Sequence, residues 1–180
     1  MTEAIKKTLQ TLEKTGKTYW IIPRETGLFL NKLIRKHDCK TVLEVGTSIG
    51  YSGIWIAEAL SHTGGKLYTV ESHDERFEKA KKHFEHAGVT DYITQLKGHA
   101  PDVPIPDMFD LLFLDATKAE YVSYIKTFLF HMKKGGIIVA DNALSHREEL
   151  KAYEEYIFSA KHLKSECIDL GTGLFMSTII

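Results

Sequence analysis

The stretch from Thr41 to Ser52 constrains the fold more than any other part of the sequence. It begins with β-branched and aliphatic residues, which suit a buried strand. Gly46 and Gly50 follow, and an apolar run from Ile49 to Leu60 is typical of a helix. A strand, a glycine turn and a helix N-terminus together form a place where a ligand can approach the bare backbone.

The chemistry around these glycines indicates which ligand would fit. The spacing Gly46-x-x-x-Gly50 differs from the G-x-G-x-x-G pattern of dinucleotide-binding folds. Glu44 precedes the first glycine by two residues, and a carboxylate there would repel a pyrophosphate. It suits a cationic ligand, such as the ammonium group of an amino acid or a sulfonium. An ordinary turn between a strand and a helix, carrying two glycines, explains this stretch equally well.

Size and composition predict one domain. With 180 residues the chain can bury a substantial core, so we expect a single domain over residues 1–180, with a helical segment at 1–38 and an α/β core at 39–180. The first 17 residues are polar, and no apolar run approaches the roughly 20 residues that span a bilayer. Cys39 and Cys167 lie far apart and outside any motif. We therefore expect a cytoplasmic protein with no membrane partner.

The charge is unevenly distributed. Residues 1–40 carry nine Lys or Arg and four Asp or Glu, while the whole chain has a formal net charge of −1. A basic segment of this kind can face RNA or an anionic substrate. A solvated helix face is the more common explanation, and we favour it.

The hydrophobic pattern alternates between helices and strands. It predicts helices at 2–15, 23–37, 49–60, 74–87, 119–132 and 146–160, with strands at 41–45, 66–70, 92–96, 110–114, 137–140, 162–169 and 173–179. In the second helix the residues expected to face inward are Leu28, Phe29, Leu33 and Ile34. This alternation favours a parallel sheet covered on both faces. Only a short turn around Gly171-Thr172 joins the last two strands, so these should pair as an antiparallel hairpin.

Acidic side chains follow most of the predicted strands. The strand ends carry Glu44 with Gly46, then Glu71, Gly98, Asp115, and finally Asp141-Asn142. In an open α/β sheet, ligands bind beyond the carboxyl ends of the strands. Asp and Asn are common in turns and helix caps, but that explanation does not comfortably cover the whole row.

The acids separate into two groups. Glu71, one strand away from the glycine loop, is placed to accept hydrogen bonds from a ribose diol; the alternative is a solvated carboxylate. Asp115, Asp141 and Asn142 would converge as three oxygen ligands, which suit Mg²⁺. Asp141-Asn142 could instead cap the next helix. Lys118, three residues after Asp115, is a candidate base beside such a cation, although most lysines at helix starts have no such role.

Several sequence motifs together resemble a known family. Residues 42–52 (VLEVGTSIGYS) resemble the first motif of class I S-adenosylmethionine (SAM)-dependent methyltransferases, and the Gly-Tyr-Ser ending is typical of the catechol and caffeoyl-CoA O-methyltransferase branch. Residues 109–118 (FDLLFLDATK) are similar to F-D-x-x-F-x-D-x-x-K of that branch. Residues 135–142 (GGIIVADN) match G-G-x-x-x-x-D-N, and residues 171–174 (GTGL) resemble its closing G-D-G-L hairpin.

The resemblance implies a Rossmann-like, doubly wound α/β fold with a seven-stranded methyltransferase sheet, mostly parallel with a C-terminal antiparallel hairpin. It implies Mg²⁺ or another divalent cation at Asp115, Asp141 and Asn142, with Lys118 and Asp115 catalytic. The SAM site implied by the resemblance consists of Glu44, Gly46, Thr47, Gly50, Tyr51, Ser52, Glu71, Ser72, Gly98, His99, Ala100 and Asp115. His99 stands where many relatives have an acid, and Thr117 replaces a bulkier residue.

The expected function is Mg²⁺-assisted O-methylation of a small catechol-like acceptor. The same scaffold could serve a tRNA hydroxyuridine O-methyltransferase, for which the basic N-terminal segment is the argument, so a nucleic-acid partner is possible but not favoured. A non-catalytic SAM-binding protein is the other alternative, because the segments that shape the acceptor pocket are short. A homodimer is possible.

Overall fold

The computed structural model describes residues 1–180, except for the side chains at positions 16 and 17. In this described chain, one sheet contains the strands β1 (Thr41–Val45), β2 (Lys66–Glu71), β3 (Ile93–Lys97), β4 (Phe109–Leu114), β5 (Met132–Asp141), β6 (Leu163–Ile168) and β7 (Leu174–Ile179). The α-helices are α1 (Glu3–Glu13), α2 (Gly16–Tyr19), α3 (Arg24–Lys36), α4 (Tyr51–Thr63), α5 (Asp74–Ala87), α6 (Tyr121–Phe128) and α7 (Lys151–Ser159). Short 3₁₀ turns are η1 (Thr90–Tyr92), η2 (Lys118–Glu120) and η3 (Leu129–His131).

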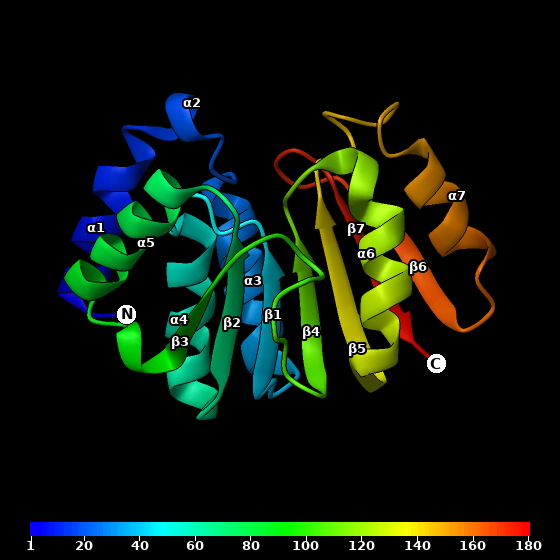
Figure 1. Cartoon of the computed structure of the whole chain (residues 1–180), viewed down its shortest axis with the longest axis horizontal. Coiled ribbons are helices and arrows are strands. Elements are labelled where there is room, and N and C mark those ends of the chain that lie inside the picture. The colour runs from blue at the N-terminus through cyan, green and yellow to red at the C-terminus, as the bar shows by residue number, and fades with distance from the viewer.

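The strands follow the order β3-β2-β1-β4-β5-β7-β6 (Figure 1). β1 to β5 pair in parallel, and β7 runs antiparallel to both β5 and β6. The expected doubly wound sheet with a C-terminal antiparallel hairpin is therefore confirmed. The chain winds outward in one direction from β1 and in the other from β4, so the strand order reverses between these two strands. A crevice for ligands is expected at their carboxyl ends.

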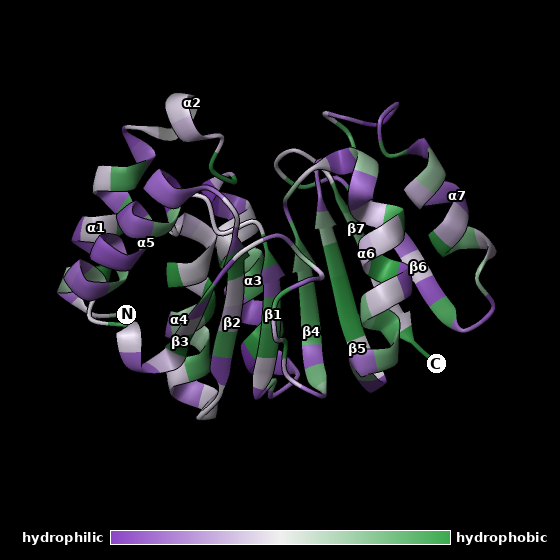
Figure 2. Ribbon diagram, viewed as in Figure 1, coloured by the Kyte–Doolittle hydropathy of each residue, from purple (hydrophilic) through white to green (hydrophobic). Residues whose placement is uncertain are grey.

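Each face of the sheet has its own hydrophobic core. Along β4, Leu111 and Phe113 join the core under α1, α3, α4 and α5, whereas Leu112 and Leu114 join the core under α6 and α7. The strands are therefore apolar on both faces, which Figure 2 shows as nearly continuous green along β4 and β5. Burying one such Leu or Phe side chain stabilises the fold by about 1.5–3 kcal/mol.

Two predicted boundaries in the second half of the chain were wrong. The helix predicted at 119–132 ends at Phe128, and β5 already begins at Met132. Gly135-Gly136 lies within β5 instead of forming a turn before it, and the β4–β5 register shifts between Phe109 and Leu111. Pairing of Met132 with Phe109 extends the sheet, so strand pairing overrides the local glycine signal.

The helix predicted at 146–160 starts only at Lys151. The preceding residues form turns because the backbone N–H groups of Leu144 and Ser145 both donate to the carbonyl oxygen of Thr172, at 3.0 Å. These bonds hold the segment against the β6–β7 connection, so the helix begins later in the chain than predicted.

The inner face of α3 also differs from the prediction. Leu28 is exposed and Phe29 only half-buried, while Leu33 and Ile34 are buried as expected. Asn31 takes an inner position because its Nδ2 donates to Glu58 Oε2 at 2.5 Å and to the carbonyl of Trp55 at 2.9 Å. These buried bonds to α4 satisfy a polar side chain on the inner face of the helix, a position that the hydrophobic pattern did not predict.

No helix in the described part of the chain combines the length and the apolar character that crossing a bilayer requires.

Candidate functional site

The glycine loop lies at the point where the strand order reverses. After β1, Gly46 adopts φ +103°, and a Cβ atom there would lie 2.1 Å from the carbonyl oxygen of Asp115. The N–H of Asp115 donates to the carbonyl of Val45 at 3.0 Å. The loop after β1 and the chain after β4 are therefore in direct backbone contact, which only glycine permits.

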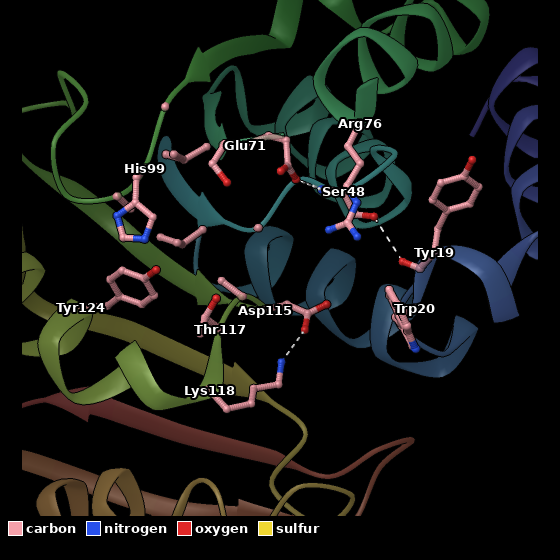
Figure 3. A pocket seen from close by; sticks show the side chains of 17 residues that line it. Tyr19, Trp20, Ser48, Glu71, Arg76, His99, Asp115, Thr117, Lys118 and Tyr124 are labelled. Atoms are coloured by element: carbon pink, nitrogen blue, oxygen red, sulfur yellow. Dashed lines mark hydrogen bonds and ion pairs between the residues drawn. The ribbon is translucent and has the colours of Figure 1, made fainter. Parts of the chain in front are cut away.

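A cavity of about 320 Å³ opens beside this contact (Figure 3). Residues from the ends of four strands (β1 to β4), from α5, from α6 and from the segment before α3 form its wall. They are Tyr19, Trp20, Val45, Gly46, Ser48, Val70, Glu71, Ser72, Arg76, Gly98, His99, Ala100, Asp115, Ala116, Thr117, Lys118 and Tyr124. We call it the loop cavity.

Glu71 is fixed by the backbone on the wall of the loop cavity. Its Oε2 accepts a hydrogen bond from the N–H of Ser48 at 2.8 Å, and its Oε1 accepts one from the N–H of His73 at 2.8 Å. The side chain is buried, and Figure 3 shows it directed toward the interior of the site. Each carboxylate oxygen keeps further acceptor capacity, so a diol at this place would find a preoriented partner.

Glu44 lies behind the loop and does not line the cavity. It is fully buried, and its Oε2 accepts a hydrogen bond from Thr69 Oγ1 at 2.5 Å, while its Oε1 has no hydrogen-bond partner among the described residues. Burial raises the pKa of this carboxyl to about 7, against the opposing hydrogen bonds of Ser52 and Thr69. A cation nearby would favour the ionised form.

Four further residues predicted for the SAM site also lie away from the wall of the loop cavity: Thr47, Gly50, Tyr51 and Ser52. Tyr51 Oη donates to Glu13 Oε1 at 2.7 Å, so this side chain extends toward α1. At Gly50, a Cβ atom would lie 2.7 Å from the ring of Phe84, so packing against α5 accounts for this glycine. The remaining predicted residues, Gly46, Glu71, Ser72, Gly98, His99, Ala100 and Asp115, do line the cavity.

Three residues that line this cavity were not predicted from the sequence: Trp20, Arg76 and Tyr124. Trp20 is 76% exposed and has the left-handed backbone angles φ 47° and ψ 47°. The Arg76 guanidinium lies 6.0 Å from the centre of its ring. At the other end of the cavity, Tyr124 Oη donates to Glu120 Oε2 at 2.7 Å, and His99 Nε2 lies 3.1 Å from Glu120 Oε1. In the sequence, the only signal for Trp20 is its place in the short aromatic and aliphatic run that precedes Pro23.

A second cavity, of about 460 Å³, adjoins the first, and we call it the acid cavity. Its wall combines polar side chains after β4 and β5 with two apolar residues before α3. The wall consists of Trp20, Ile21, Asp115, Lys118, Asp141, Asn142, Ser145, His146 and Thr172. The structure thus brings the three predicted metal ligands and the predicted base to one place.

The acids of this cavity are close enough to influence each other. Asp141 is 2% exposed, and burial together with the negative charge of Asp115 raises its pKa to about 7. Asn142 donates through Nδ2 to Ser145 Oγ at 3.1 Å, which leaves Oδ1 as its acceptor atom. Two carboxylates and an amide oxygen are a donor set that suits Mg²⁺, and a cation would relieve the repulsion between the acids. Among the described residues, no group of three His, Cys, Asp or Glu side chains could hold a metal ion without a further type of ligand.

Lys118 is held by two neighbours. Its Nζ donates to Asp115 Oδ1 and to Tyr121 Oη, both at 3.0 Å, and the side chain is only 13% exposed. Tyr121 in turn donates to the carbonyl of Leu114 at 3.0 Å. Burial and the charges of Asp115 and Asp141 raise the pKa of Tyr121 well above its usual range, so the phenol stays protonated and fixes the amine.

Three side chains belong to both cavities: Trp20, Asp115 and Lys118. A ligand in the loop cavity would therefore meet a ligand in the acid cavity beside a carboxylate, an amine and an indole ring. Together, the fold and these cavities define a Rossmann-like α/β protein with two adjoining cavities at the carboxyl edge of its sheet.

Comparison with known sequences places the chain in a family. Residues 1–163 match the O-methyltransferase family, to which the chain therefore belongs. It is 32% identical over 149 residues to a catechol O-methyltransferase of Niastella koreensis, an alignment that covers 79% of this chain and 66% of that protein. It is 34% identical over 144 residues to caffeoyl-CoA O-methyltransferase 1 of Eucalyptus globulus, covering 73% and 57%. The chain thus spans less than two thirds of the length of these curated relatives.

Solved structures share the whole fold. The O-methyltransferase TomG from Streptomyces achromogenes, solved in complex with SAM, superimposes with a TM-score of 0.83 at 26% identity, over 99% of this chain and 90% of that chain. The O-methyltransferase from Bacillus cereus, solved in complex with SAH, gives a TM-score of 0.83 over 100% and 92%, and at 22% identity it shows likeness of fold alone.

Proposed function

We propose that this chain transfers the methyl group of SAM to a hydroxyl group of a small catechol-like acceptor, with Mg²⁺ or another divalent cation bound beside the acceptor. The observation that carries the proposal is the junction of the loop cavity and the acid cavity at Asp115, Lys118 and Trp20. A donor in the first cavity and an acceptor in the second would meet there, and holding two reactants in line supplies much of a transfer rate.

The loop cavity would hold the donor. When bound, SAM supplies an electrophilic methyl group on a sulfonium. The Glu71 carboxylate would accept hydrogen bonds from the ribose hydroxyls, and Gly46 lets the cofactor lie against the backbone. Glu44 is buried behind the loop, and its Oε1 has no hydrogen-bond partner among the described residues. When ionised, this carboxylate would attract the positive charges of the cofactor. The presence of SAM in the structure of TomG supports this assignment.

The acid cavity would hold the acceptor. Asp115, Asp141 and Asn142 would bind the cation; when bound, Mg²⁺ supplies positive charge that stabilises a deprotonated hydroxyl. Trp20 and Ile21 provide the apolar side of this cavity, which suits the ring of a catechol. The names of the relatives, catechol and caffeoyl-CoA O-methyltransferases, support an acceptor of this class.

Lys118 would take the proton of the acceptor hydroxyl at Nζ once this nitrogen is present as the neutral amine. Asp115 and Tyr121 fix this atom at the junction, where it can reach a hydroxyl that faces the donor. A phenolic hydroxyl is mostly protonated at neutral pH, with a pKa near 10, so removal of its proton is needed before attack. General base catalysis of this kind contributes about 10²–10⁴-fold to the rate.

The test combines binding with turnover. Calorimetry with SAH should show binding to the loop cavity, and radiolabelled SAM should label catechol in the presence of MgCl₂. EDTA should abolish the labelling, and added MgCl₂ should restore it. Equal rates with and without EDTA would remove the cation from the mechanism, and absence of SAH binding would remove the donor. Labelling of tRNA but not of catechol would instead support the RNA alternative.

A further inference from the structure

The loop between β6 and β7 touches the acid cavity from a distant part of the sequence. Thr172 lies on the cavity wall, and its Oγ1 donates a hydrogen bond to Asp141 Oδ1 at 2.7 Å. Asp141 ends β5, 31 residues earlier in the chain. The two side chains meet because β7 runs antiparallel beside β5, with Leu174 opposite Asp141.

The same loop also fixes the backbone that follows Asp141. The N–H groups of Leu144 and Ser145 donate to the carbonyl of Thr172 at 3.0 Å, and the N–H of Ala143 donates to the carbonyl of Gly173 at 2.9 Å. The approach at Gly173 is close, since a Cβ atom there would lie 2.5 Å from the backbone nitrogen of Leu144. The position of Thr172 relative to residues 141–145 is therefore set by the backbone, independently of its side chain.

The hydroxyl adds a distinct constraint on the carboxylate. Asp141 is 2% exposed, so solvent does little to orient it, and the charge of Asp115 acts to push it away. A hydrogen bond from a rigidly placed donor holds one of its oxygens against this repulsion. Partners of this kind orient metal ligands, and their loss typically costs about 10–100-fold in metal affinity.

We infer that Thr172 is a positioning residue that holds the Asp141 carboxylate in place to receive the divalent cation. This inference rests on the proposed cation site at Asp115, Asp141 and Asn142. It assigns to the β6–β7 loop a role in cation binding, although the loop contributes no ligand of its own.

Two substitutions separate this role from a purely structural one. Thr172→Val keeps the shape of the side chain and all the backbone hydrogen bonds but removes the hydroxyl. Thr172→Ser keeps the hydroxyl and removes only the methyl group. A residue that merely stabilises the hairpin would respond to both changes through the midpoint of thermal unfolding, and Mn²⁺ affinity would follow stability.

The experiment measures Mn²⁺ binding to the SAH-saturated protein by electron paramagnetic resonance. Thr172→Val should bind Mn²⁺ about 10–100-fold more weakly than the wild type, while Thr172→Ser stays within about threefold. SAH affinity, measured by calorimetry, should be unchanged in both. In an Asp141→Asn background, Thr172→Val should cause little further loss, because the two changes act on one interaction.

The outcomes distinguish the inference from the proposed function. Wild type and Thr172→Val binding Mn²⁺ equally would overturn the inference and leave the cation site intact. A wild type that binds no Mn²⁺ would overturn both. If Thr172→Val does not fold, Thr172→Ala provides the same comparison with a smaller side chain, and equal affinity of that variant and the wild type would again overturn the inference.

Discussion

The Cα of Gly46 faces the carbonyl oxygen of Asp115 so closely that a Cβ atom would lie 2.1 Å from it. This contact joins the ends of β1 and β4, the neighbouring strands between which the sheet reverses its order. Asp115 lines both cavities, so the geometry of this contact affects the loop cavity and the acid cavity together.

The first prediction tests this contact with Gly46→Ala. The added methyl group must displace the Asp115 backbone and also adopt φ +103°, so we expect stability to fall by about 2–4 kcal/mol and SAH binding to be lost. Gly64→Ala is the matched control, since it has φ +73° but nothing within 4 Å of the Cβ position. The control should cost only about 1 kcal/mol. Urea unfolding and calorimetry measure both, and equal effects of the two substitutions would refute a special role for the contact.

The second prediction concerns the amine at the cavity junction. Lys118→Met should lower kcat for catechol methylation at least about 100-fold, because it removes the proposed base. SAH affinity should change little, because Lys118 lies at the junction of the two cavities, whereas Glu71 and the glycine loop would make the main contacts with the donor. Lys134→Met, at an exposed position outside both cavities, is the control and should retain full activity. Steady-state kinetics measure kcat for both variants. A kcat for Lys118→Met near that of the wild type would exclude Lys118 as the base.

The third prediction concerns Trp20. Trp20→Ala should raise KM for catechol roughly 3- to 10-fold by removing an aromatic contact with the acceptor ring, with a smaller effect on SAH affinity. Trp20→Phe should retain most of the affinity, and Phe130→Ala should have no effect, because Phe130 is exposed but lines neither cavity.

A spectroscopic measurement checks the same residue without turnover. Trp55 is buried and Trp20 is 76% exposed, so acrylamide quenching of the fluorescence reports mainly on Trp20. Catechol added to the SAH complex should reduce this quenching. Unchanged quenching at saturating catechol would place the acceptor elsewhere.

The fourth prediction follows from the pKa of Glu44, which burial raises from 4.5 to about 7. Because the folded-state pKa lies above the unfolded one, the stability from the protonated carboxyl is present in full below about pH 4.5 and is lost as the pH rises through 7. In ligand-free protein, this loss amounts to about 3 kcal/mol. The side chain of Glu44→Gln cannot titrate. The free energy of unfolding of this variant should therefore rise relative to that of the wild type between pH 5 and pH 8.

Urea unfolding of the ligand-free protein at these two pH values measures the effect. The exposed Glu155→Gln is the control and should follow the wild type at both. Asp141, whose pKa is also raised to about 7, should leave a residual pH dependence in Glu44→Gln. Identical pH profiles of Glu44→Gln and the wild type would contradict the prediction.

Sequence reasoning succeeded where the signal is local. β1, its glycine loop and the acids after β2, β4 and β5 are contiguous patterns, and parallel pairing brings the ends of such strands to one edge. For the same reason Asp115, Asp141 and Asn142 were expected on one wall, and they share the acid cavity.

Contacts between distant segments left no signal in the sequence. Thr47 and Ser52, expected at the cofactor, do not line the loop cavity. The late start of α7 depends on bonds to Thr172, and the inner position of Asn31 on α3 depends on its bond to Glu58. Nothing adjacent in the sequence signals either bond.

The sequence by itself determined the order of the elements, the glycine loop and the row of acids, because hydrophobic periodicity and turn chemistry are properties of neighbouring residues. Only the tertiary structure decided that Trp20 lines the junction with Asp115 and Lys118, that Arg76 lies beside it and that Thr172 bonds to Asp141. These relationships join segments up to 98 residues apart in the chain, the separation of Trp20 and Lys118. They arise from how the sheet twists and how its helices pack, and a pattern read along the chain does not encode those distances.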